Sequence, residues 1–213
     1  MNSNSTYKHH LKVLLLGQSG IGKTCVLLRF LKEELLPCEH VPTVSIEARS
    51  ILQTIEAKST LISVFDSPGN PRFNDVVRAL WHSMTLIVFV ASLADVESIE
   101  YVKEKHQLIF PEDSSDELNH VRKILILNQF EGEETEAARE AFMELANITH
   151  IKVVECNVWE STTCADYIMA ALKETIKEIV IKEQNEKRVI KQSKRERLKR
   201  FFCRCWRSDG PLK

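Results

Sequence analysis

The sequence predicts an α/β sandwich with a mostly parallel β-sheet. Short apolar segments alternate with segments of helical periodicity along the chain, which is typical of α/β folds. Most apolar segments are continuous rather than alternating, as expected for strands buried on both faces. The 213 residues suit one domain of roughly 150–200 residues and an appendage. Charged residues make up an ordinary 28%, which excludes a globally disordered chain.

The first third of the chain predicts a strand, a turn, a helix and two paired strands. Residues 11–16 are apolar, and residues 23–34 have helical periodicity. Residues 44–55 and 60–65 are β-branched runs, which favour two paired strands. Residues 66–71 are a dense cluster of Pro, Gly and Asn, so a loop is expected there.

The remainder alternates between helix and strand. Residues 74–84 suit a short helix, and residues 85–92 form a continuous apolar run typical of a buried central strand. Residues 111–119 are polar and acidic, which indicates a loop. We also expect helices over residues 93–109, 134–146 and 165 to at least 181, and strands over residues 123–128 and 151–155.

Charge is unevenly distributed although the net charge is only −1. Residues 187–213 contain 11 basic and two acidic residues, so this segment carries +9 and the rest of the chain −10. Such asymmetry points to a polyanionic partner for the tail, either a membrane or a nucleic acid. We therefore expect a polar extension over residues 1–10, a domain over 11–181 and a basic tail over 182–213. No apolar run approaches the roughly 18–20 residues of a transmembrane helix.

Four cysteines, Cys25, Cys38, Cys156 and Cys164, are scattered among apolar residues. No CxxC pair or Cys/His cluster accompanies them, so a structural zinc site is not expected. We interpret them as small buried hydrophobic residues in a reducing cytosol.

A phosphate-binding motif stands between the first strand and the first helix. It fits GxxxxGK[ST] at every position and has the strand and helix context that the motif requires. Glycines let successive backbone N–H groups cradle phosphate oxygens, and the helix N-terminus adds positive potential. The lysine reaches the β- and γ-phosphates, and the threonine offers a hydroxyl to Mg²⁺. The candidate nucleotide-binding residues here are Gly17, Gln18, Ser19, Gly20, Ile21, Gly22, Lys23, Thr24 and the adjoining Cys25.

Two downstream segments could complete a magnesium site. Asp66 ends a predicted strand and precedes Gly69, so its carboxylate could hold Mg²⁺ while the Gly69 N–H senses the γ-phosphate. Thr43 follows a proline in the loop after the first helix, and its hydroxyl could complete the shell with Thr24. A Thr beside Pro at the start of a strand is, however, also ordinary.

With these residues in place, the chain resembles the Ras superfamily of small GTPases, and the Rab branch most. The resemblance covers about residues 12–181, and it implies a P-loop NTPase fold with a six-stranded, mostly parallel sheet and helices on both faces. It also implies Mg²⁺ with GTP or GDP as the bound cofactor. The matching blocks are Gly17–Thr24, Pro42-Thr43, Asp66-Ser67-Pro68-Gly69-Asn70, Arg72-Phe73, and Asp95 with Glu97 and Ser98.

The base-recognition motifs depart from the family pattern. Where the family has Asn-Lys-x-Asp, this chain has Asn128, Gln129 and, two residues later, Glu131. Glu131 keeps the carboxylate that accepts hydrogen bonds from guanine, but on a longer stem. Val158 and Trp159 stand at the second base loop, where the Val158 N–H could meet the guanine oxygen and Trp159 could stack on the base. Because buried polar recognition is sensitive to geometry, guanine preference is expected but weakened.

The catalytic position departs as well. Asn70 stands where the family has the glutamine that positions water, and its amide is one methylene shorter. Pro68 and Pro71 flank it and stiffen the loop. Because this catalysis depends on positioning, a displacement of about 1 Å can cost roughly 10²-fold. Slow intrinsic hydrolysis is therefore expected.

The tail admits three interpretations. Residues 198, 201, 202 and 205 follow helical spacing, so a membrane-surface segment with basic and aromatic residues is favoured. A solvated basic extension is the alternative, and nucleic-acid binding is disfavoured because no base-reading module is evident. Cys203 and Cys205 resemble the Cys-x-Cys of Rab proteins but are not terminal, so palmitoylation is a better hypothesis than prenylation.

The leading function is a GTP-binding switch, as in signalling and vesicle trafficking, on the cytosolic face of a membrane. Effector and regulator proteins would bind its switch loops. The main alternative is a pseudo-GTPase scaffold with little or no nucleotide turnover. A P-loop phosphotransferase is disfavoured, because no Arg-rich substrate lid is present.

Overall fold

The structure is a computed structural model, and it describes residues 7–35, 43–111, 121–129, 136–149, 151–182 and 185. The chain divides into two compact units, Met1–Lys173 and Glu174–Lys213. The first unit holds all the strands described below. In the second unit, residues 174–182 are helical.

A six-stranded sheet with the order β2-β3-β1-β4-β5-β6 forms the centre of the first unit. All neighbouring pairs are parallel except β2 with β3, which form an antiparallel hairpin. This confirms the predicted α/β class and the mostly parallel sheet. The strands are β1 (His9–Leu16), β2 (Glu47–Ile55), β3 (Lys58–Asp66), β4 (Leu86–Ala91), β5 (Arg122–Asn128) and β6 (Lys152–Cys156).

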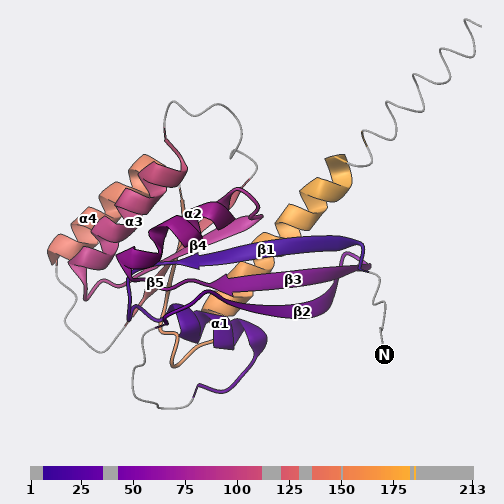
Figure 1. The fold of residues 1–213 in the computed structure, drawn as a ribbon, viewed down its shortest axis with the longest axis horizontal. Coiled ribbons are helices and arrows are strands. Elements are labelled where there is room, and N and C mark those ends of the chain that lie inside the picture. The colour runs from indigo at the N-terminus through magenta and orange to yellow at the C-terminus, as the bar shows by residue number, and fades with distance from the viewer. Residues whose placement is uncertain are drawn as a thin grey trace, which may run out of the picture. The chain divides into compact units, whose positions relative to one another are not determined.

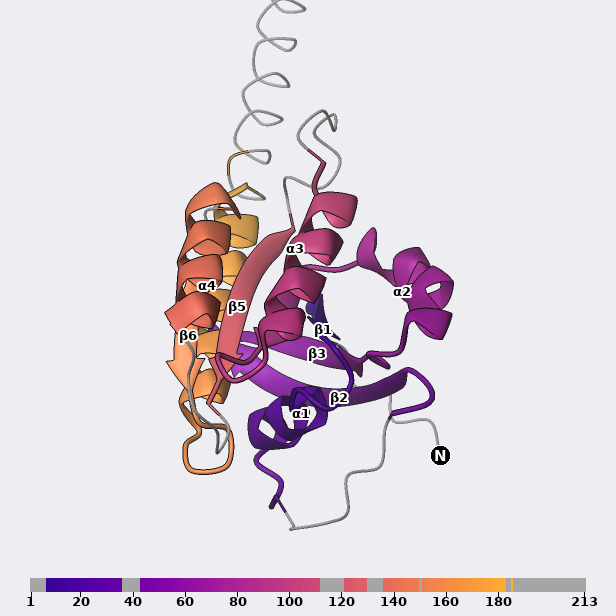
Figure 2. The same ribbon diagram turned by 90° about the vertical axis from the view of Figure 1, so that its left-hand side faces the viewer.

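Helices cover both faces of this sheet. Figure 1 shows α1 (Lys23–Leu31) away from α3 (Val96–Ile109) and α4 (Glu136–Thr149), which contact each other. Figure 2 shows α2 (Asn74–Trp81) on the far side of α3 from α4. Every residue of β4 is buried, as its continuous apolar run predicts. Each fully buried aliphatic or Phe side chain of this kind contributes about 1.5–3 kcal/mol, so this central strand anchors the loops at its ends.

β2 differs from the prediction that the strands are buried on both faces. Its residues are mostly exposed, and it begins at Glu47 rather than at residue 44. Val44, which precedes it, is 72% exposed. The reason is position, because β2 is an edge strand that pairs with β3 alone.

Several helix ends also differ from the predicted bounds, and two of them have a clear local cause. The predicted helix over 23–34 ends at Leu31, because Lys32 takes a left-handed conformation with φ 61° and closes the helix through backbone hydrogen bonds. The predicted helix over 93–109 begins only at Val96. Asp95 caps it, since its Oδ1 accepts the N–H groups of Glu97 (3.1 Å) and Ser98 (3.4 Å).

The last described helix covers residues 163–182, as predicted from residue 165 to at least 181. In the first unit its residues Cys164, Ile168 and Leu172 are buried. Across the described part of the chain, no helix is both long and apolar enough to span a bilayer. The basic tail beyond residue 185 lies outside the described residues.

Candidate functional site

The candidate residues gather where the strands end. Parallel strands bring their carboxyl ends to one edge of a sheet, which is where α/β folds bind ligands. In the register of this sheet, Leu15 lies opposite Asp66, Leu16 opposite Phe89, and Asn128 opposite Cys156. The loops after β1, β3, β5 and β6 therefore start from one edge, although they are far apart in the sequence.

The phosphate-binding motif forms the turn between β1 and α1. Gly22 is the residue before the helix and has φ 96°, a left-handed conformation that favours glycine. Lys23 opens the helix and is only 5% exposed. Its Nζ donates a hydrogen bond to the Gln18 carbonyl at 2.8 Å, so the ammonium lies over the loop's own backbone.

Burial perturbs Lys23 strongly. Desolvation disfavours the charged ammonium and lowers its pKa to about 8, although the negative charge of Asp66 opposes this shift. The described residues give Lys23 no salt bridge within 4 Å. A buried, poorly compensated cation at a helix N-terminus attracts a polyanion.

Three oxygen-bearing side chains meet beside Lys23. The Thr24 hydroxyl donates to Asp66 Oδ2 at 2.6 Å and lies 3.3 Å from the Thr43 hydroxyl. Asp66 is fully buried, and its other oxygen, Oδ1, has no hydrogen-bond partner among the described residues. Burial raises the pKa of Asp66, and the Thr24 hydrogen bond and Lys23 oppose the rise. Hard oxygen ligands with a spare buried lone pair suit Mg²⁺, so these residues fit that ion.

Gly69 closes against the phosphate-binding motif. A Cβ at this position would lie 2.2 Å from the Ser19 nitrogen and 2.4 Å from the Gln18 carbonyl carbon. Any side chain here would therefore force the two loops apart. The motif after β3 and the phosphate-binding motif are in direct backbone contact.

Asn70 follows Gly69 and is exposed. Its Oδ1 accepts the Arg72 N–H at 3.0 Å and caps the short 3-10 helix η1 (Pro71–Phe73). The side chain of the candidate catalytic residue thus has a local structural partner. Sequence reasoning assigned it a catalytic role and did not anticipate the cap, although Asn before Pro is a common start of such turns.

Asn128 joins the two halves of the site. It ends β5, is only 1% exposed, and its Nδ2 donates to the Ile21 carbonyl at 3.2 Å. Its Oδ1 accepts the Val158 N–H at 3.1 Å. One amide therefore holds both the phosphate-binding motif and the loop after β6. The expected contact between the Val158 N–H and a base oxygen would have to share a donor that already binds Asn128.

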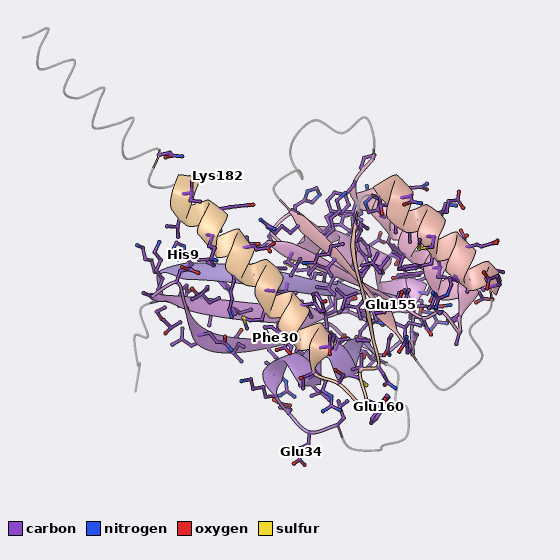
Figure 3. All side chains as sticks on the ribbon, turned by 180° about the vertical axis from the view of Figure 1, so that it is seen from behind. His9, Phe30, Glu34, Glu155, Glu160 and Lys182 are labelled. Carbon is purple, nitrogen blue, oxygen red and sulfur yellow. The ribbon has the colours of Figure 1, made fainter. Side chains whose placement is uncertain are left out.

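Arg29 is a residue that sequence reasoning missed. From α1, its Nε donates to the Val158 carbonyl at 2.8 Å, and its Nη2 donates to the Trp159 carbonyl. Figure 3, in which Phe30 and Glu160 are labelled, shows this loop beside α1. Trp159 itself is 41% exposed, so its ring is available for stacking. No local pattern could have revealed the contact, because the partners are 129 and 130 residues apart.

The other candidates are less informative. Gln129 is exposed, and its N–H donates to the Cys156 carbonyl at 2.9 Å. Cys25 is only half-buried in the first turn of α1, which differs from the expectation that it is buried, and Cys38 lies outside the described residues. Glu131, Cys203 and Cys205 lie outside the described residues.

Comparison with known proteins agrees with this geometry. The model of the Ras family matches residues 12–178. The Ras-related protein SEC4 of Candida albicans is 28% identical over 184 residues, covering 85% of this chain and 84% of the relative. The GTP-binding protein YPT1 of Saccharomyces cerevisiae is 24% identical over 189 residues (87% and 89%). The Ras-related protein Rab-13 of Canis lupus familiaris is 27% identical over 157 residues (73% and 75%). With the family match spanning most of the chain, this protein belongs to the Ras family.

Proposed function

We propose that this protein is a Rab-like, GTP-binding molecular switch with slow intrinsic hydrolysis. The observation that carries the proposal is the buried Lys23 beside the Thr24–Asp66 hydrogen bond, at the turn between β1 and α1. A cation at a helix N-terminus and an oxygen cluster within one small region suit a nucleotide phosphate chain with Mg²⁺. The name of the relative YPT1, a GTP-binding protein, supports guanine as the base.

In this proposal the phosphate-binding motif recognises the negative charge of the nucleotide's phosphate chain. Lys23 exchanges the Gln18 carbonyl for phosphate oxygens, and the backbone N–H groups of the motif donate to the same anion. Thr24, Asp66 and Thr43 would hold Mg²⁺, which supplies charge neutralisation at the phosphates when it is bound. Gly69 lies next to Ser19, so its loop is placed to sense whether a terminal phosphate is present.

Slow turnover follows from the residue after Gly69. Asn70 is shorter than the family's glutamine, and its side-chain oxygen caps η1 through Arg72. The cap is worth about 1 kcal/mol and holds the Asn70 side chain at this turn, which limits its freedom to orient a water molecule. Pro71 also restricts the backbone at this point. The GTP-bound state is therefore expected to persist until another protein supplies the missing catalytic groups.

Exposed apolar residues beside the switch loops support protein partners. Val44, next to Thr43, and Val76, on α2, are 72% and 56% exposed. Isolated exposed apolar residues are common, but these two adjoin the segments expected to change with the nucleotide. We infer that effectors and regulators bind there.

Bound-nucleotide analysis tests the proposal. Chromatography of the nucleotide released from purified full-length protein is expected to give GDP, or GDP with GTP. An empty site, or GTP alone that never turns over, would contradict the switch and support the pseudo-GTPase scaffold. Adenine nucleotides alone would contradict the guanine assignment.

Single-turnover hydrolysis tests the proposed role of Asn70. Asn70→Gln is expected to speed GTP cleavage, and Asn70→Ala should leave the slow parent rate almost unchanged. A parent rate typical of unassisted family members would contradict the proposed defect.

The tail is proposed to place the switch on a cytosolic membrane surface. Lys and Arg near an anionic leaflet contribute about 1 kcal/mol each, and stable anchoring needs a second signal such as acylated Cys203 or Cys205. Changing both cysteines to Ser should weaken membrane residence but leave salt-sensitive vesicle binding. Truncation before residue 187 should release the protein, and membrane retention of that truncated form would exclude the tail as the anchor.

A further inference from the structure

Two cysteines stand at the two ends of the loop after β6. Cys156 is the last residue of β6, and Cys164 is the second residue of the helix over 163–182. Their thiol groups lie close enough for each to shift the pKa of the other directly. Both are free thiols and both are buried, at 6% and 0% exposure. The fold therefore brings into contact two nucleophilic groups that the phosphate and base chemistry leaves unused.

The loop between them carries the second base-recognition segment. It contains Val158 and Trp159, which Asn128 and Arg29 hold through the backbone contacts described above. Cys156 is also tied to the first base-recognition segment, because its carbonyl accepts the Gln129 N–H at 2.9 Å. A covalent bond between the two thiols would close a ring around the segment that covers the base.

We propose that Cys156 and Cys164 are a modification site, at which a hydroperoxide closes a disulfide across the base-binding loop and slows nucleotide release. The second half of this proposal depends on the proposed nucleotide-binding function, and the first half does not. A hydroperoxide such as hydrogen peroxide is the oxidant.

The two thiols have different roles in the oxidation. The hydrogen bond from Cys156, the N–H of Ala165 and the charge of Arg29 lower the pKa of Cys164, while burial opposes the shift. The hydrogen bond with Cys164 and burial raise the pKa of Cys156. The Cys164 thiolate attacks a peroxide oxygen, breaks the O–O bond and becomes a sulfenic acid, and the released hydroxide takes a proton to form water. Cys156 then attacks the sulfenic sulfur, forms the S–S bond and releases a second water, so two thiols and one peroxide give one disulfide and two waters.

Burial controls when the reaction occurs. Because both thiols are shielded, the oxidant reaches them when the loop opens locally. Bound nucleotide favours the closed loop, so it should slow oxidation. By reciprocity the disulfide, which limits loop opening, should slow nucleotide release, at least about fivefold for an ordinary coupling between sites.

Peptide mapping tests the site itself. The full chain carrying Cys203→Ser and Cys205→Ser, so that the tail thiols do not interfere, is treated with hydrogen peroxide, alkylated in denaturant and digested. We expect a Cys156–Cys164 cross-linked peptide that dithiothreitol removes. Cys156→Ser and Cys164→Ser should each abolish it, and Cys38→Ser is the matched control that should retain it. Sulfinic acid, or disulfides to other cysteines in place of this link, would overturn the proposal.

Release of a fluorescent GDP derivative tests the functional half. Release should slow after oxidation in the parent and in Cys38→Ser, and oxidation should have no effect in Cys156→Ser. A cross-linked protein that releases the probe as fast as the reduced protein does would overturn the proposed control of nucleotide release. If no nucleotide binds to the reduced protein, the proposed function fails, and the peptide map still decides whether the disulfide forms.

Discussion

The proposed phosphate side and the proposed base side of the site are built differently. On the phosphate side, one continuous turn from Gly17 to Thr24 supplies the backbone, and Lys23 and Asp66 are both buried next to it. On the base side, loops after β5 and β6 are held together by Asn128 and Arg29, and Gln129 and Trp159 are exposed. The phosphate side keeps the complete family motif, whereas the base side has changed side chains on an intact backbone scaffold.

This difference shows which recognition tolerates change. Phosphate binding by N–H groups and one lysine depends on a local backbone conformation, so few substitutions are compatible with it. Base binding depends on single side chains from separate loops, and these can vary while Asn128 still holds the loops. We therefore expect tight phosphate-driven binding with reduced discrimination between bases.

Lys23→Ala should have the largest effect, because it removes the buried cation of the phosphate side. Loss of one partner of a buried charge pair costs 2–5 kcal/mol, so GDP binding should weaken by roughly 1,000-fold. Competition against a fluorescent GDP derivative measures this loss. Lys103→Ala, on α3 and outside the site, is the matched control. Equal affinities of Lys23→Ala and parent would refute the phosphate-binding assignment.

Asn128→Ala should damage both sides together. It leaves the Val158 N–H and the Ile21 carbonyl without their partner in a buried position. We expect a loss of about 2–3 kcal/mol in the free energy of unfolding, and weaker nucleotide binding as well. Urea unfolding of the parent and the variant measures the first effect. If stability is unchanged, Asn128 does not join the two halves.

His106 provides a reference away from both sides. It is buried near Phe89 and Phe110, and Lys123 Nζ lies 3.1 Å from its Nε2. Burial, and then the charge of Lys123, lower its pKa from 6.5 to about 4. Between these values the unfolded chain binds a proton that the folded chain does not. Stability should therefore fall as the pH drops below about 6.5, by about 2 kcal/mol at pH 5.

The neutral variant His106→Gln isolates this effect. Its unfolding free energy should vary less with pH between about 7.5 and 5 than that of the parent, and the two curves should become parallel above that range. Identical pH dependence in both proteins would show that His106 titrates normally in the folded state.

Arg29→Ala should have the smallest effect, confined to the base side. It removes two hydrogen bonds to backbone carbonyls of an accessible loop, so we expect a cost of about 1 kcal/mol and faster nucleotide release. Stopped-flow release of a fluorescent GDP derivative measures it, with the exposed Arg78→Ala on α2 as the control. Unchanged release would mean that Arg29 does not restrain the loop.

The sequence predicted the fold and the turn between β1 and α1 well, because both depend on local patterns. Continuous apolar runs predicted β4 and β5, and GxxxxGK[ST] placed Lys23 and Thr24. The late start of α3 was also encoded, since Asp95 is a favoured N-cap residue and the acidic Glu97 follows in the first turn, although the predicted helix begins at residue 93.

Long-range contacts could not be predicted in the same way. The contact of Arg29 with the loop at Val158 requires knowledge of which strands are neighbours. Cys156 and Cys164 were expected to be buried, and they are, but only the fold shows that they lie in contact. The cap made by Asn70 depends on a 3-10 turn that the breaker cluster did not specify.

Calorimetric titration of GDP and ADP, with Mg²⁺, into nucleotide-free full-length protein most directly tests the contrast between the two sides. The same titrations are made on the double variant Gln129→Lys and Glu131→Asp, which restores the family's base motif. The parent should bind both nucleotides through their phosphates and prefer GDP modestly, and the double variant should raise that preference at least about tenfold without changing its affinity for ADP. Failure of the parent to bind either nucleotide, or equal GDP preference in both proteins, would contradict an intact phosphate side beside an altered base side.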